Sequence, residues 1–251
     1  MSQPDAATEL EETISDEIGA LPPVDPVSEP AALDRRWHMV RLVLLAQVVV
    51  ALVAILGNLA EYRLLADFRD GLYQDDITAD RDAQASDQRQ SLIGMTQIAV
   101  FVVSGVVILL WLYRSARHVR ALGATRLQYT PGWTVGWFFI PLFSLWVPYL
   151  AVRELWEASN DPARRPRGEG CALLGWWWTL WLANGFAGQA VWRMARSAET
   201  VEQFIRLNVV GTLGEVLGIA LAAVSLALFA DIHGAQRMHA ARLTQQSSVP
   251  G

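Results

Sequence analysis

The sequence predicts an all-α integral membrane protein with four transmembrane helices and one irregular, proline- and tryptophan-rich membrane segment. Two observations lead to this class. Hydrophobic residues make up 53% of the 251 positions and charged residues only 18%, against about a quarter charged in a typical soluble domain. The charges are also unevenly spread, since several long stretches contain none. This distribution excludes an ordinary soluble enzyme, a secreted disulfide scaffold and a nucleic-acid-binding protein.

Four runs are long enough to cross a bilayer, which takes roughly 20 apolar residues. They are residues 42–60, 91–113, 171–192 and 207–230, and the first three are uncharged. The fourth contains one acid, Glu215, among twelve Leu, Ile, Val or Phe residues. Each of those favours insertion by roughly 0.3–0.6 kcal/mol, whereas one central acid opposes it by about 3 kcal/mol. The fourth run is therefore also expected to span.

Residues 131–150 form a fifth apolar run that is interrupted by prolines and glycines. Pro141 lacks an amide donor and clashes with the preceding turn, so it breaks or kinks a helix. The run is either a re-entrant hairpin that returns to the side it came from or a kinked helix that adds a fifth span. Irregular backbone at membrane depth is tolerated where protein covers it.

A short amphipathic helix is predicted directly after this run, over residues 148–160. Tyr149, Val152 and Leu155 fall on one helical face, and Arg153, Glu154 and Glu157 fall on the other. This pattern is typical of a helix lying in the membrane surface. Neighbours in sequence do not face each other on a helix, so Arg153 and Glu154 should not pair. The expected partners of the two glutamates are the arginines at 114, 117, 120 and 126.

The two ends of the chain are expected to lie outside the membrane. Residues 1–34 contain nine acids, no base and five prolines, which predicts a disordered acidic tail. A short C-terminal tail, residues 244–251, follows the membrane domain of residues 35–243.

The arginine distribution predicts that both termini are cytoplasmic. Every basic residue other than histidine is an arginine, and cytoplasmic loops of membrane proteins are enriched in such residues. With a re-entrant hairpin, thirteen arginines lie inside and seven outside; with five spans the division is ten and ten. The hairpin topology therefore agrees better with the rule. Tryptophans near the helix ends are expected to form interfacial belts; they are Trp37, Trp111, Trp176, Trp177, Trp178 and Trp192.

The sequence PGWTVGWFFIPLFSLWVPYLAVRELWEAS, followed by LLGWWWTLWLAN, resembles a known bacterial membrane family called domain of unknown function 4328, common in actinobacteria. The resemblance covers roughly residues 92–232 and is most specific between 131 and 159. It implies a multi-pass protein of the bacterial plasma membrane and implies no catalytic residue. The matching positions are Pro131, Gly132, Trp133, Gly136, Trp137, Pro141, Trp146, Pro148, Tyr149, Arg153, Glu154 and Trp156.

The last apolar run has a stripe of small residues and one acidic residue, Glu215, well inside the run. The stripe consists of Gly211, Gly214, Gly218 and Ala222, which would let another helix approach closely, either within this chain or in a second copy. An ionisable residue inside a membrane span is a functional candidate by default. For Glu215 the alternatives are structural pairing and a transport or ligand role. Its expected structural partners are Asn184, Gln189, Arg193 and Arg206.

No catalytic motif occurs in the sequence. With one cysteine, Cys171, and scattered histidines, the chain is expected to use no metal and no cofactor. The predicted function is that of an accessory, sensing or scaffolding protein that contacts membrane lipid or a membrane or cytoplasmic protein partner. The alternative is a small transporter or channel that uses Glu215 and the broken segment 131–150.

Topology reporters should place both termini inside. Fusions at residue 1, near Arg165 and near residue 245 should report the cytoplasm, and a fusion near Asp80 should report the outside. A fusion near Arg165 that reports the outside would contradict the hairpin and support five spans.

Overall fold

The computed structural model describes residues 29–73, 75–124, 127–161 and 171–247, and over these residues the chain is all-helical. Residues 1–28 of the expected N-terminal tail, residues 248–251 of the expected C-terminal tail, and the arginines at 126, 164, 165 and 167 lie outside the described residues. The elements in chain order are α2 (Glu29–Arg69), α3 (Asp76–Ala121), α4 (Pro131–Gly136), η1 (Trp137–Phe139), η2 (Phe143–Leu145), α5 (Val147–Asn160), α6 (Ala172–Ser197) and α7 (Val201–Ser247).

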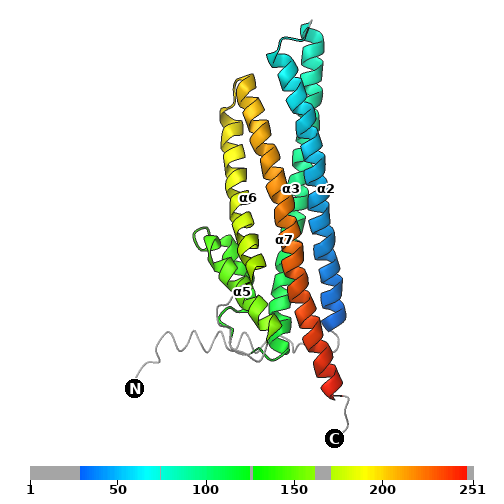
Figure 1. Ribbon diagram of the computed structural model, residues 1–251, viewed down its shortest axis with the longest axis vertical. Helices are drawn as coiled ribbons and strands as arrows, with labels where there is room; N and C mark the ends of the chain where they lie inside the picture. Colours follow the sequence, from blue (N-terminus) through cyan, green and yellow to red (C-terminus); the bar gives the residue numbers. More distant parts are fainter. Residues whose placement is uncertain (1–28, 74, 125–126, 162–170, 248–251) are drawn as a thin grey trace, which may run out of the picture.

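Four long helices alternate in direction (Figure 1). The α2–α3 and α6–α7 turns lie at the upper end of the view, and the end of α7 lies at the lower end. Among the described residues, α2, α3 and α7 are long and apolar enough to cross a membrane. The fourth, α6, has 26 residues and is rich in tryptophan and glycine. With 46 residues α3 is about 70 Å long, so it exceeds a hydrocarbon core of about 30 Å.

The turn between α2 and α3 is defined by local capping. Gly71 has a φ of 67°, a left-handed conformation that favours glycine, and its N–H donates to the carbonyl of Phe68 at 3.2 Å. Asp75 caps α3, because its carboxylate accepts a hydrogen bond from the N–H of Thr78 at 2.7 Å. These signals reverse the chain within a few residues.

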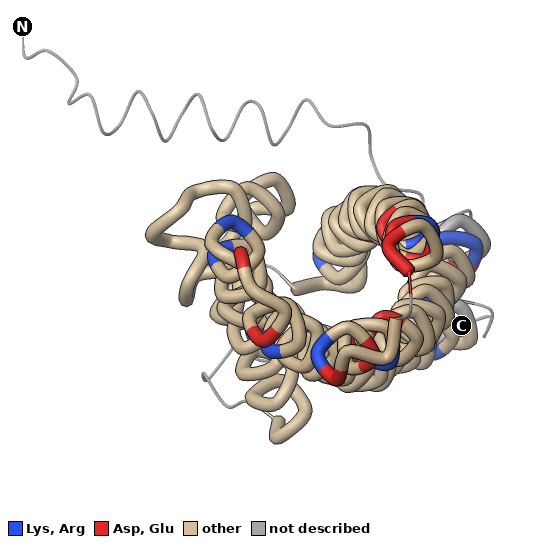
Figure 2. The backbone as a smooth tube through the Cα atoms, turned by 90° about the horizontal axis from the view of Figure 1, so that it is seen from above, with Lys and Arg blue, Asp and Glu red and all other residues tan. Residues whose placement is uncertain are grey.

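The long helices form an open arc rather than a closed bundle. The helix α2 packs along both α3 and α7, and α6 packs mainly along α7. The view from above shows this arrangement, with α3 and α6 at the two ends of the arc (Figure 2). The concave side of the arc is therefore lined by all four long helices.

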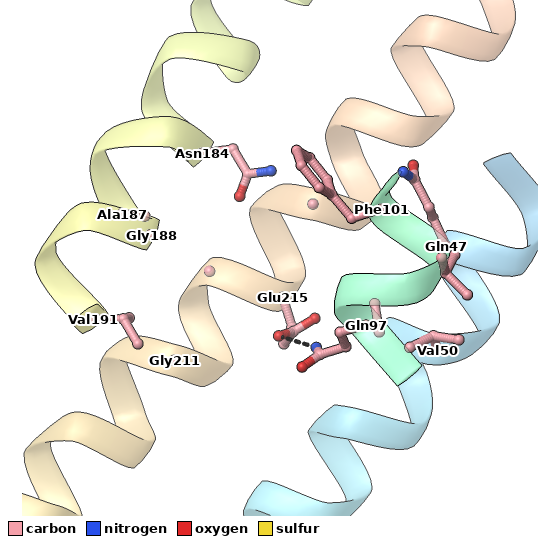
Figure 3. A pocket seen from close by; sticks show the side chains of 14 residues that line it. Gln47, Val50, Gln97, Phe101, Asn184, Ala187, Gly188, Val191, Gly211 and Glu215 are labelled. Atoms are coloured by element: carbon pink, nitrogen blue, oxygen red, sulfur yellow. Dashed lines mark hydrogen bonds between the residues drawn. The ribbon is translucent and has the colours of Figure 1, made fainter. Parts of the chain in front are cut away.

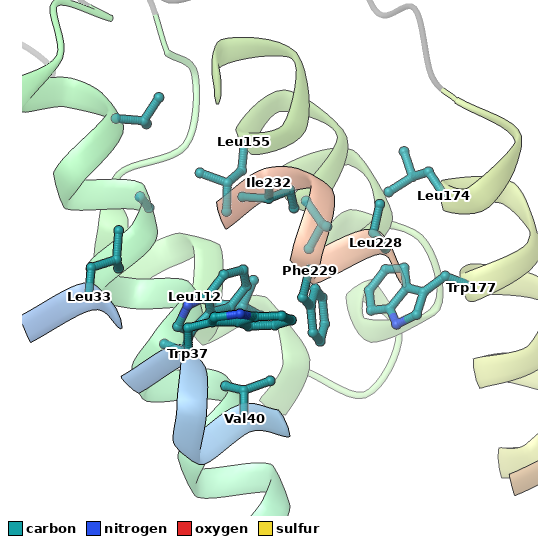
Figure 4. Close-up of a cluster of buried hydrophobic side chains, with 14 of the residues drawn as sticks. Leu33, Trp37, Val40, Leu112, Leu155, Leu174, Trp177, Leu228, Phe229 and Ile232 are labelled. Carbon is teal, nitrogen blue, oxygen red and sulfur yellow. The ribbon is translucent and has the colours of Figure 1, made fainter. Parts of the chain in front are cut away.

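An aromatic core closes the lower end of the arc (Figure 4). Trp111 is fully buried, with its ring centroid 5.1 Å from Phe229 and 6.1 Å from Trp37, and Trp177 lies 6.2 Å from Phe229. Three of the tryptophans expected in an interfacial belt are thus core residues, because five helices converge on them. The core also contains Leu33, Val40, Leu44, Leu112, Ala116, Val119, Ala124, Val152, Leu155, Ala158, Leu174, Ala222, Leu228 and Ile232.

The start of α2 corrects the predicted extent of the disordered tail. The acidic tail was expected to reach residue 34, but residues 29–34 are helical. Leu33 is buried in the aromatic core, and a carboxylate oxygen of Asp34 lies 3.0 Å from Nε2 of His233 on α7. These contacts with distant residues explain why the last part of an acidic, proline-containing stretch folds.

Residues 131–146 do not form a continuous or kinked helix. The helix α4 has six residues, about 9 Å, and two short 3₁₀ turns follow it. Thr130 caps α4 by accepting a hydrogen bond from the N–H of Trp133 at 3.3 Å. Ile140 is extended just before Pro141, where the chain turns. As a result, α3 ends and α6 begins in the same, lower half of the arc (Figure 1).

Candidate functional site: a polar cleft on the concave face

The concave face of the arc contains a cavity of about 310 Å³ (Figure 3). All four long helices contribute to its lining. The polar side chains around it are Gln47 from α2, Gln97 from α3, Asn184 from α6 and Glu215 from α7. The remaining lining residues are Val50, Ala51, Val100, Phe101, Ala187, Gly188, Val191, Gly211, Gly214 and Gly218.

Glu215 is half-buried and accepts a hydrogen bond from Gln97, with Nε2 of Gln97 2.7 Å from Oε1 of Glu215. This partner differs from the four that the sequence suggested. Asn184 lines the same cavity, whereas Arg193 and Arg206 are exposed. Gln97 is not among the residues that the sequence singled out. The available signal was that it is an amide within the uncharged run 91–113.

The small residues of α7 form one wall of the cavity. A Cβ added at Gly214 would meet no heavy atom within 4 Å outside its own stretch of helix backbone. At Gly211 and Gly218 an added Cβ would have as its nearest neighbour an amide nitrogen at 4.0 Å, from Asn58 and Asn184 respectively. The stripe therefore leaves space next to Glu215 over these three positions. Ala222, its fourth member, is buried in the aromatic core instead.

A second cavity of about 490 Å³ adjoins the first, sharing Phe101, Asn184 and Gly188 with it. Asn184 and Phe101 point toward each other between α6 and α3 (Figure 3). The lining of the second cavity is mostly apolar and aromatic: Leu145, Trp181, Leu182, Gly185 and Phe186, with Gln189 as a further amide. Leu145 belongs to η2, so the broken segment 131–146 contributes to the cleft.

A separate polar network ties α2, α3 and α7 together toward the upper end. Oε2 of Glu61 accepts hydrogen bonds from Gln90 at 2.7 Å and from Asn208 at 2.9 Å. Asn58 donates to Thr212 at 3.2 Å and accepts from Gln90 at 3.3 Å. These residues were not singled out from the sequence as functional candidates. Glu61 and Gln90 border the apolar runs, where loop residues are expected. The network fixes the helices that carry the upper part of the cleft.

The base of the broken segment is anchored by Glu154. Its carboxylate accepts hydrogen bonds from the backbone N–H groups of Gln128 and Tyr129, the latter at 3.0 Å. Arg120 donates to the carbonyl oxygen of the same Tyr129. The expected bond partners of Glu154 were arginines; its carboxylate instead accepts from two backbone N–H groups, because the chain from α3 returns past α5. Burial, and then the nearby Glu154 carboxylate, raises the pKa of the Tyr129 phenol.

The family-motif residues form a connected set of rings and turns. Ring centroids are 4.8 Å apart for Trp133 and Trp137, and a further chain of contacts runs through Phe143 to Trp146. A Cβ at Gly136 would lie 3.2 Å from the Trp133 ring, so glycine permits this packing. The ring centroids of Tyr149 and Trp178 are 6.1 Å apart. Nε1 of Trp156 donates a hydrogen bond to a carboxylate oxygen of Asp231 at 2.6 Å. The remaining positions divide into buried Pro131 and Pro148, and exposed Gly132 and Pro141.

Arg153 is the motif residue that remains, and its Nε lies 3.8 Å from a carboxylate oxygen of Glu157, one helical turn away. Its guanidinium also lies 5.8 Å from the centre of the Tyr149 ring.

Over the described residues, no three His, Cys, Asp or Glu side chains lie close enough together to hold a metal ion. The chemistry that the cleft offers is therefore one carboxylate, several amides and an apolar lining.

These features define a class: an all-helical protein with long apolar helices and a polar cleft on the concave side of their arc. The chain belongs to the family described as Domain of unknown function (DUF4328), which matches residues 75–234. That match takes in α3, α6 and most of α7, and so the Gln97–Glu215 pair and Asn184. No curated protein and no solved structure matches the chain.

Replacing Glu154 with alanine should loosen the chain between α3 and α4. Hydrogen bonds to a charged acceptor contribute about 1.5–3 kcal/mol, which corresponds to about tenfold faster amide exchange or more. Hydrogen–deuterium exchange at residues 128–129 is the measurement, with Arg153→Ala on the same helix as the matched control. Equal exchange in wild type and Glu154→Ala would show that these bonds do not anchor the segment.

Proposed function

We propose that α2, α3, α6 and α7 all cross the membrane, that residues 131–146 form a re-entrant hairpin, and that both termini are cytoplasmic. The alternating helix directions and the return of the chain to the lower half support the hairpin (Figure 1). The arginine count supports the orientation.

The exposed side chains of the broken segment also support insertion into lipid. Phe139 and Leu142 are each 71% exposed. In water such a surface would be costly, whereas hydrocarbon accepts it. Four further large apolar residues in the segment are exposed: Trp133, Phe143, Leu145 and Trp146.

On this arrangement the protein binds a small molecule within the membrane, as a sensor or as a carrier, and performs no chemistry on it. The single observation that carries this function is the cavity beside Glu215. A carboxylate inside a membrane bundle is costly and is usually paired or faces a cavity. Here Glu215 has one amide partner and faces a space whose α7 wall is formed by three glycines.

A purely structural role for Glu215 would favour a different surrounding. A structural acid is normally enclosed by its partners, and the glycines next to it would let helices close on it. In this protein the glycines leave a cavity that the amides of Gln47, Gln97 and Asn184 line as well. Discontinuous segments next to such cavities are common in transporters, and η2 reaches the adjoining cavity through Leu145.

Filling the cavity should abolish ligand binding without unfolding the protein. Gly214→Leu places a side chain in the cavity from a position where a Cβ meets no neighbouring atom. We expect wild-type protein extracted in mild detergent to carry a small-molecule adduct of defined mass, measured by native mass spectrometry, and Gly214→Leu to lose it.

The matched control is Gly234→Leu. Gly234 is a glycine of the same helix whose added Cβ also meets no atom within 4 Å, and it is not among the residues that line the cleft. It should retain the adduct. The same adduct on Gly214→Leu as on wild type, or no adduct on wild type, would contradict ligand binding in the cleft.

A second candidate function is an interaction surface formed by residues 131–159, acting on anionic lipid headgroups. The observation that favours it is the position of Arg153, which lies on the amphipathic helix α5 directly after the exposed apolar segment. A cation held at that level would meet lipid headgroups. Glu154 does not belong to this surface, because it is bound to the backbone of Gln128 and Tyr129.

Arg153→Ala should reduce the stabilisation of the protein by anionic lipid. The measurement is the shift in thermal unfolding midpoint on adding phosphatidylglycerol, compared with phosphatidylcholine. We expect Arg153→Ala to lose about half or more of the extra anionic shift, since each basic residue near such a surface contributes about 1 kcal/mol. Arg193→Ala, an exposed arginine near the upper end, should keep it. An unchanged shift in Arg153→Ala would remove this function.

A further inference from the structure

We propose that the ligand of the cleft is a protonated amine with an apolar or aromatic tail. The ammonium lies beside Glu215, and the tail lies in the adjoining cavity. This inference rests on the ligand-binding function proposed above and adds the charge and shape of the ligand.

The charge of the cleft selects the charge of the ligand. Among the described residues that line the two cavities, Glu215 is the one ionisable side chain. An ionised carboxylate removed from water is stabilised most by an opposite charge, and an amide partner such as Gln97 supplies only part of that stabilisation. A bound cation supplies the rest, whereas an anion would be repelled.

Hydrogen-bonding groups near Glu215 match an ammonium group. An ammonium has three donors and no acceptor. The second carboxylate oxygen of Glu215 and the amide oxygens of Gln47 and Asn184 are acceptors around the same cavity. Gln97 donates to Glu215 and so holds the carboxylate at the cavity wall (Figure 3).

The adjoining cavity matches an apolar tail. Its volume of about 490 Å³, next to one of about 310 Å³, is in the range of small-molecule sites, which is about 300–1,000 Å³. Trp181, Leu182 and Phe186 line it, and Phe101 lies where the two cavities meet. A molecule with a charged head and an apolar body would thus place each part against groups of its own polarity.

The order of the helices also favours a ligand that dissolves in the bilayer. Residues of both α3 and α6 line the cleft, and these two helices form the ends of the open arc (Figure 2). An amphiphile can approach such an opening sideways from the lipid, with its charged head at the interface and its tail in hydrocarbon. A fully polar solute lacks that route.

Three probes of one shape test the charge directly: 4-phenylbutylamine, 4-phenylbutanol and 4-phenylbutyrate, which are cationic, neutral and anionic at pH 7. The experiment is isothermal titration of each into the purified full chain in lipid nanodiscs, with empty nanodiscs as the background. We expect the amine to bind on the order of tenfold more tightly than the alcohol, because a charged hydrogen-bonded pair is formed. The carboxylate should bind most weakly.

Glu215→Gln should bring the amine to within about threefold of the alcohol, since the shape is kept and the charge removed. Glu199→Gln, an exposed acid between α6 and α7, should leave the preference unchanged. Gly214→Leu should weaken all three probes together, which tests the site independently of its charge and remains available if Glu215→Gln fails to fold.

Equal binding of the three probes, tightest binding of the carboxylate, or an unchanged amine preference in Glu215→Gln would each overturn the cation assignment. A neutral or anionic co-purified ligand that Gly214→Leu removes would do the same. It would leave the ligand-binding function of the cleft intact.

Discussion

The packing of Trp111 against Phe229 and Trp37 is the interaction on which the rest of the structure depends. It lies where α2, α3, α5, α6 and α7 converge, and it holds all of them at one end. Lipid is as apolar as a leucine side chain, so helices in a bilayer associate through close packing and polar contacts rather than through removal of apolar surface from water. At the lower end, where this packing is dense, the helices are in close contact. Elsewhere they have room to separate.

The helix α7 changes character along its length, and this change produces the cleft. Its lower half contributes Leu228, Phe229 and Ile232 to the core, and its upper half presents glycines to the cavity. Toward the upper end, hydrogen bonds from Asn58, Gln90 and Asn208 replace the aromatic packing. The cleft around Glu215 thus lies between two differently built contacts, an aromatic one below and a polar one above.

The broken segment depends on local rules at each of its turns and on one long-range contact at its base. Thr130 and Pro131 start α4, and Pro141 follows an extended residue where the chain turns. Glu154, more than twenty positions away in sequence, holds the returning backbone of Gln128 and Tyr129. Because η2 also borders the second cavity through Leu145, the shape of this segment and the shape of the cleft are linked.

The sequence by itself determined the class of protein and the family, since apolar run length and the motif between 131 and 159 are local properties of the chain. It also marked Glu215, because an acid in an apolar run is conspicuous. The tertiary structure decided what those residues contact: Gln97 beside Glu215, backbone amides beside Glu154, and Trp37, Trp111 and Trp177 in a core. Each of these joins helices far apart in the sequence, and periodicity within a helix indicates a face but not its neighbour. The helical start of α2 followed the same rule, because Leu33 joins a core built from several helices and Asp34 contacts His233, some 200 positions later.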